Sequence, residues 1–138
     1  MWWMYALLSA LFAALTAVLA KVGIRGVDSN LATAVRTTVV LVLTWGIVAL
    51  RGGLAELPTL TRSNVLFLVL SGLATGLSWL CYFRALQLGP VSRVAPVDKL
   101  SVALTIVLAV VFLGERLSWQ AGLGAGLIIT GTLVLIWA

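Results

Sequence analysis

The sequence predicts an all-α integral membrane protein built as a bundle of five transmembrane helices. Of its 138 residues, 62% are hydrophobic and only 9% are charged, whereas a soluble domain carries about a quarter charged residues. The mean hydropathy is +1.18. Thirteen charged side chains, nine basic and four acidic, are too few to cover a surface in water. The solvent around most of this chain is therefore expected to be a lipid bilayer.

Five stretches are long and apolar enough to cross the membrane as helices, which needs roughly 20 residues each. They cover approximately residues 1–20, 31–50, 65–86, 91–113 and 119–137. Together they use nearly the whole sequence and leave no stretch for a soluble domain. We therefore expect a single transmembrane domain over residues 1–138.

The residues between these stretches are typical of helix ends. Asp28 precedes the second stretch and Ser118 precedes the fifth, and both are good N-cap residue types. Gly89-Pro90 is expected to end the third helix, because proline cannot continue the backbone hydrogen-bond ladder. Gly114 is expected to end the fourth, since glycine tolerates the left-handed conformation of a C-cap.

The residue inventory argues against several functions. The sequence has no histidine, and Cys81 is its single cysteine, so disulfides, His or Cys zinc sites and Cys–His catalysis are excluded within one chain. The four carboxylates are dispersed and form no evident acid/base pair. We expect no catalytic residues, metal site or cofactor, and hence no enzyme. The nine basic residues are scattered and form no patch of the kind that binds nucleic acid.

Among the charged residues inside the predicted membrane helices, Arg36, Asp98 and Lys99 lie farthest from the helix ends. A charge near the bilayer centre costs at least about 2.5–3.5 kcal/mol, so such residues normally face protein or water. Arg36 could instead extend to the headgroups, and Asp98 could pair with Arg36 on a neighbouring helix. Asp98 and Lys99 diverge by about 100° on a helix, so we do not expect them to pair well with each other. The third interpretation is that these charged side chains line a polar cavity that is open to a substrate.

Two further features favour a cavity. Pro96 is expected to break the fourth helix and to free a backbone carbonyl, unless it lies in the first turn, where proline costs little. On the third helix Trp79 and Tyr82 share one face with Thr75 and Ser78, and this face could line a pocket or pack between helices. The candidate substrate-binding residues are Arg36, Trp79, Tyr82, Asp98 and Lys99.

Small residues indicate where the last helix could approach another helix closely. Gly122 and Gly126 form a GxxxG pair, and Thr130 extends the same face by one turn. This face is a candidate either for a dimer contact or for packing within the chain.

Essentially the whole chain, and most strongly its C-terminal half, resembles the EamA domain of the drug/metabolite transporter superfamily. The resemblance rests on Tyr82-Phe83-Arg84-Ala85-Leu86, Gly89-Pro90-Val91-Ser92, Val94-Ala95-Pro96-Val97-Asp98-Lys99-Leu100 and Phe112-Leu113-Gly114-Glu115-Arg116-Leu117. It implies a multi-pass protein of the cell (inner or plasma) membrane that moves a small metabolite by alternating access. Most members carry two such domains, inverted relative to each other, whereas this sequence contains one. It also lacks the acidic residue in the first helix that the small multidrug resistance relatives use.

A single repeat predicts a dimer, with a small-molecule substrate bound between the subunits. The loops on the N-terminal side hold three basic residues and those on the opposite side hold four, a bias too small to fix one orientation. If Arg36 and Lys99 are also counted, six basic residues lie toward the side opposite the N-terminus and three lie on the N-terminal side. The expected partner is therefore either a second copy in the antiparallel orientation or an oppositely oriented paralogue.

The substrate is expected to carry an anionic group, as an amino acid or another carboxylate does. The alternative is a non-transporting partner or assembly subunit of another EamA-type protein.

Overall fold

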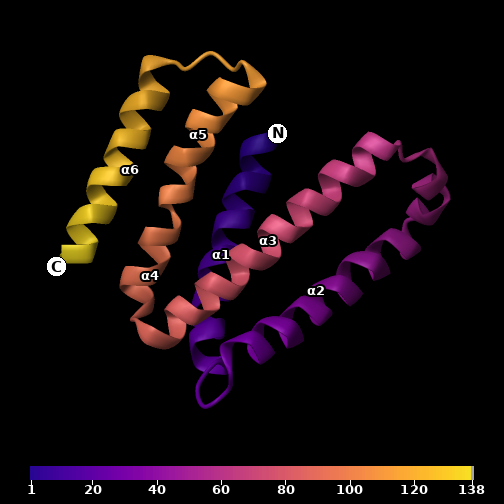
Figure 1. Ribbon diagram of the computed structural model, residues 1–138, viewed down its shortest axis with the longest axis horizontal. Helices are drawn as coiled ribbons and strands as arrows, with labels where there is room; N and C mark the ends of the chain where they lie inside the picture. The colour runs from indigo at the N-terminus through magenta and orange to yellow at the C-terminus, as the bar shows by residue number, and fades with distance from the viewer. Residues whose placement is uncertain (138) are drawn as a thin grey trace. The chain divides into compact units, whose positions relative to one another are not determined.

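The computed structural model describes residues 1–137, which form α-helices and one 3₁₀ helix, with no strand among them (Figure 1). The predicted domain, residues 1–138, extends one residue beyond the described part. The elements in chain order are α1 (Trp2–Gly23), α2 (Ser29–Leu50), the 3₁₀ helix η1 (Gly53–Thr59), α3 (Arg62–Leu88), α4 (Val91–Asp98), α5 (Leu100–Leu113) and α6 (Trp119–Trp137).

The predicted all-α membrane architecture is confirmed. Within the described residues, five stretches are helical, long and apolar enough to cross a membrane, and α4 together with α5 makes up one of them. The third begins at Arg62 rather than at 65, because the Thr61 hydroxyl accepts a hydrogen bond from the Asn64 backbone N–H at 3.2 Å. This N-cap starts the helix three residues before the predicted apolar stretch.

The predicted caps at Asp28, Ser118 and Gly114 are confirmed. The Asp28 carboxylate accepts hydrogen bonds from the backbone N–H groups of Asn30 (2.9 Å) and Leu31 (3.1 Å), which caps α2. The Ser118 hydroxyl accepts one from the Ala121 N–H at 3.2 Å and caps α6 in the same way. Gly114 ends α5 in the left-handed conformation, with φ of 66°, which a residue with a Cβ rarely adopts.

Several threonine hydroxyls on the membrane helices bond to carbonyls of their own helix. Thr33 and Thr37 on α2 donate to the carbonyls of Ser29 (2.8 Å) and Thr33 (2.7 Å), one turn earlier. Thr75 on α3 donates to the Ser71 carbonyl at 2.9 Å. Hydrocarbon offers no hydrogen-bond partner, so this local bonding removes the cost of carrying hydroxyls through the bilayer.

The chain divides into two compact units, and each is described by itself. Unit 1 comprises Met1–Val18 and the chain from Leu88 onward, and unit 2 comprises Leu19–Gln87. In unit 1, α6 runs antiparallel to α4 and α5 and packs against both (Figure 1). In unit 2, α2 and α3 run antiparallel and are joined through η1.

The fourth membrane span is interrupted at Lys99, between α4 and α5. Pro96 lies in the second turn of α4, so the alternative that placed it in the first turn is wrong. The N–H of Lys99 bonds to the Pro96 carbonyl and the N–H of Val102 bonds to the Lys99 carbonyl, both at 3.0 Å and both spanning three residues. The Pro96 carbonyl also accepts a hydrogen bond from the Thr132 hydroxyl of α6 at 3.2 Å. The predicted break is therefore present, three residues after the proline, and α6 supplies a donor beside it.

This interhelical bond generates a prediction with a matched control. Thr132 is buried, with 4% of its surface exposed, and its substitution by Val removes the hydroxyl but keeps the shape. We expect Thr132→Val to lower the free energy of unfolding in detergent micelles by about 0.6 kcal/mol, the mean for interhelical bonds in membranes. Thr130→Val removes a hydroxyl that bonds only to the Gly126 carbonyl of its own helix and should have a smaller effect. Equal losses from both substitutions would contradict a stabilising role for the Pro96 contact.

Candidate functional site

The charged centre of unit 2 is Arg36, stacked on aromatic side chains of the neighbouring helix. Its guanidinium carbon lies 4.2 Å from the ring centroid of Trp79 and 5.4 Å from that of Phe83. Trp79 and Phe83 are four residues apart on α3 and therefore share one face of that helix. Arg36 is the eighth residue of α2 and lies about two turns inside the span. The helix–helix contact thus holds a cation at membrane depth.

The aromatic rings stabilise the charge of Arg36 but leave hydrogen-bonding capacity unused. A guanidinium over an aromatic face gains about 0.5–2 kcal/mol, with the larger values where water is excluded. The ring faces offer no oxygen to the five N–H donors of the guanidinium. Within unit 2, no carboxylate forms an ion pair with Arg36. The geometry therefore presents a fixed cation whose planar edge suits a carboxylate or phosphate.

Tyr82, another predicted site residue, lies beside this cluster. Its ring meets that of Phe83 edge to face, with centroids 6.5 Å apart and planes inclined at 66°. Tyr82 and Phe83 are adjacent in sequence, so the two rings leave α3 in different directions, and it is Phe83 that lies under Arg36. Phe83 is not among the predicted site residues. Its spacing of four residues from Trp79 is the signal that would have identified it.

Asp98 and Lys99 lie in unit 1 and form an ion pair, with 3.4 Å between Lys99 Nζ and Asp98 Oδ2. The expectation that these adjacent residues do not pair well is wrong. Lys99 keeps a right-handed helical backbone conformation, with φ of −71° and ψ of −9°, so it is the long lysine side chain that reaches across to the carboxylate of Asp98. Both side chains are substantially exposed, Lys99 by 55% and Asp98 by 37%. The pair is therefore accessible from outside unit 1.

The small-residue face of α6 is mostly open in this chain. A Cβ built on Gly126 would meet no atom within 4 Å, and one built on Gly122 would meet only Leu117, at 3.9 Å. Thr130 is exposed and bonds to its own helix. The face remains a predicted contact surface. Among residues 1–137, no three His, Cys, Asp or Glu side chains gather closely enough to hold a metal ion.

The stacking of Arg36 generates a second prediction, which a double-mutant cycle can measure. Arg36→Gln and Trp79→Leu should show a coupling energy of about 0.5–2 kcal/mol in the free energy of unfolding, because each substitution removes the same cation–aromatic contact. Arg36→Gln combined with Trp45→Leu is the matched control, since Trp45 is an exposed tryptophan of the same span. Additive effects of Arg36→Gln and Trp79→Leu would show that the contact contributes nothing.

Comparison with known proteins identifies the family of this chain. Residues 1–137 match the EamA-like transporter family. An uncharacterized transporter in the cobO 3′ region of Sinorhizobium sp is 51% identical over 134 residues, which cover 97% of this chain and 95% of that protein. A probable 4-amino-4-deoxy-L-arabinose-phosphoundecaprenol flippase subunit, ArnF, from Erwinia tasmaniensis is 35% identical over 105 residues, covering 70% of this chain and 82% of that protein. No solved structure matches the chain. With five membrane-crossing helices and a match over nearly all of its length, this multi-pass membrane protein belongs to the EamA-like transporter family.

Proposed function

We propose that this chain is a subunit of a secondary transporter that moves a small anionic metabolite across the cell membrane by alternating access as a dimer. The observation that carries the proposal is the guanidinium of Arg36, held on Trp79 and Phe83 within the membrane. An amino acid or another carboxylate-bearing solute is the substrate class. Membership of the EamA-like transporter family supports transport, and with it a role as a transporter rather than as an enzyme.

The charge of the membrane-embedded residues supports an anionic substrate. Arg36 and Lys99 contribute two positive charges and Asp98 one negative charge, which leaves an excess of one positive charge. In a low-dielectric environment such an excess favours binding of an anion. A carboxylate bound by Arg36 gains two charge-assisted hydrogen bonds in a bidentate geometry. We propose that Trp79 and Tyr82 then flank the rest of the solute.

The ion pair of Asp98 and Lys99 fits a position on the wall of the transport cavity. Exposing this ion pair to hydrocarbon within a membrane span is costly. The pair is more stable where water or protein surrounds it. The interruption of the span at Lys99 is of the kind that transporters place at binding sites near the midplane. We propose that Asp98 and Lys99 are the substrate-binding residues of unit 1.

A dimer supplies the second repeat that alternating access uses. Transporters commonly rock one repeat against another around a central site, and this chain contributes five spans, one repeat of its family. The proposed partner is a second copy in the antiparallel orientation or an oppositely oriented paralogue, and the open glycine face of α6 is the proposed contact. The relative from Erwinia tasmaniensis is itself named a flippase subunit, which supports assembly with another chain.

That relative also favours a second candidate function. Its name assigns to it a phosphoundecaprenol-linked amino sugar, a lipid that carries a phosphate. In this alternative the chain does not transport alone but serves as the partner subunit of another EamA-type protein, and Arg36 contacts the phosphate of a lipid-linked sugar. The two candidates differ in whether the purified chain moves a soluble solute by itself.

Uptake into proteoliposomes tests the first candidate. We expect the purified chain to take up at least one of lactate, succinate and alanine faster than empty liposomes do. Arg36→Gln should lower that uptake at least tenfold, since a hydrogen bond to a charged group contributes about 1.5–3 kcal/mol. Arg51→Gln, which removes an exposed arginine at the end of α2, is the control and should leave uptake unchanged.

Two outcomes decide against this candidate. Uptake of a purely cationic solute such as choline, unaffected by Arg36→Gln and Lys99→Met, would contradict the anion site. No uptake by this chain alone, with transport restored by a second EamA-type chain, would support the partner-subunit role instead.

The antiparallel homodimer makes a separate prediction about orientation. Reporters fused to the C-terminus, one active only outside the cell and one only inside, should both give signal, because the loop charges are nearly balanced. Adding three lysines to the loop at Gly52-Gly53 should then place all copies in one orientation and abolish transport. Signal from one side only, together with full transport by this chain alone, would rule out the antiparallel homodimer.

A further inference from the structure

We infer that the loop between α1 and α2, together with the end of α3, forms a second binding site, which takes a phosphate-bearing anion. It lies in unit 2 and shares no residue with the Arg36 cluster. The inference does not rest on the proposed function, since it concerns different side chains and does not require that the chain transports anything.

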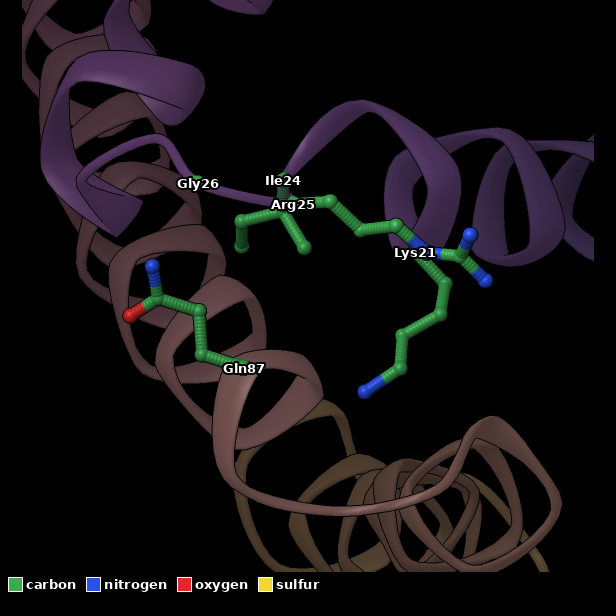
Figure 2. A pocket seen from close by; sticks show the side chains of 5 residues that line it. All are labelled: Lys21, Ile24, Arg25, Gly26 and Gln87. Carbon is green, nitrogen blue, oxygen red and sulfur yellow. The ribbon is translucent and has the colours of Figure 1, made fainter.

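The site is a cavity of about 280 Å³ lined by Lys21, Ile24, Arg25, Gly26 and Gln87 (Figure 2). Lys21 and Arg25 come from the end of α1 and the loop after it, and Gln87 comes from the last turn of α3. Pockets for small organic ligands measure roughly 300–1,000 Å³. This cavity is at the lower limit of that range, a size suited to a single phosphate group or a small headgroup.

Hydrogen bonds between the loop and α3 hold the cavity in shape. Lys21 Nζ donates to the Leu86 carbonyl, and Gln87 Nε2 donates to the Val27 carbonyl at 2.6 Å. The other end of the Gln87 amide, Oε1, accepts from Arg84 Nη1 at 2.8 Å. Gly26, with φ of 71°, provides the reversal that brings the loop back over α3. The cavity is therefore built by specific contacts between distant segments of unit 2.

The cavity is electropositive. Its lining has two cations, Lys21 and Arg25, and no carboxylate, and Arg84 adds a third positive charge behind Gln87. The nearest carboxylate along the chain, Asp28, accepts the two hydrogen bonds that cap α2. Arg25 is exposed, and no hydrogen bond or ion pair of its side chain is found within unit 2. A guanidinium, an ammonium and an amide around one cavity match the charge and the several acceptor oxygens of phosphate.

The position of the cavity at the ends of three membrane helices identifies where the phosphate would come from. α1 ends at Gly23, α2 begins at Ser29 and α3 ends at Leu88, so the cavity lies at the boundary between membrane and water. Lipid phosphates lie at this depth, and basic pockets there bind anionic headgroups. The buried side chain of Ile24 adds an apolar wall beside the cations. A free phosphate in solution shares the same chemistry and can reach the cavity as well.

Native mass spectrometry of the full chain, released from detergent after mixing with equal amounts of phosphatidylglycerol and phosphatidylcholine, tests the inference. We expect the wild-type chain to retain phosphatidylglycerol preferentially. Arg25→Gln should reduce that preference about tenfold, and Arg25→Lys should restore part of it. Arg84→Gln is a second variant, expected to weaken binding through Gln87. Arg51→Gln, which lies outside the cavity, is the control and should retain the wild-type preference.

A titration with inorganic phosphate distinguishes the two sources. Preference for phosphatidylglycerol that millimolar phosphate does not displace identifies a lipid headgroup. Phosphate that raises the thermal stability of the wild type but not of Arg25→Gln, without any lipid preference, identifies a soluble phosphate, and both results support the site. The inference is overturned if the wild type shows neither effect, or if Arg25→Gln and Arg84→Gln behave as Arg51→Gln does.

Discussion

The absence of water around its five membrane spans is the constraint on which the rest of this structure depends. In hydrocarbon every backbone N–H and carbonyl needs a partner within the protein, and continuous helices supply it. The same constraint explains why Thr33, Thr37 and Thr75 bond to carbonyls of their own helices. Where a span is interrupted, at Lys99, the hydroxyl of Thr132 lies against the Pro96 carbonyl. A polar side chain in a membrane span that has no such partner within the protein is therefore a candidate for a functional role.

Arg36 is the clearest of these groups, because it connects the fold to the proposed function. The Asp28 cap fixes the start of α2 and so fixes the depth of Arg36 in the membrane. The four-residue spacing of Trp79 and Phe83 places two ring faces against its guanidinium. This contact stabilises the charge without neutralising it. A cation that remains charged at membrane depth is suited to attract and orient an anion, which is what a transporter of carboxylates needs.

The sequence was sufficient to predict the membrane architecture and most helix ends, since both depend on local properties. Runs of apolar residues define the spans, and Asp28, Ser118 and Gly114 act on backbone groups within a few residues of themselves. The contacts of the candidate site depend on tertiary structure instead. The sequence selected Arg36 and Trp79 separately, but only the tertiary structure shows that their side chains touch and that Phe83 takes part.

Two other features could not be predicted for related reasons. The pairing of Asp98 with Lys99 depends on the conformation of the long lysine side chain, whereas the prediction considered only the directions in which the two side chains leave the helix. The basic cavity requires Gln87 to meet the loop 60 residues earlier in the chain, a contact that no local pattern in the sequence indicates.

The fluorescence of Trp79 tests most directly the claim that Arg36 and its aromatic neighbours bind an anionic solute. The measurement uses a variant in liposomes that keeps Trp79 and has phenylalanine at the other five tryptophans, Trp2, Trp3, Trp45, Trp119 and Trp137. Adding lactate, succinate or alanine should change the Trp79 emission in a saturable way, because an anion on the guanidinium alters the charge over the indole. The same titration with Arg36→Gln should give no change. A Trp79 emission that none of the three solutes changes, or a change that persists in Arg36→Gln, would contradict the account.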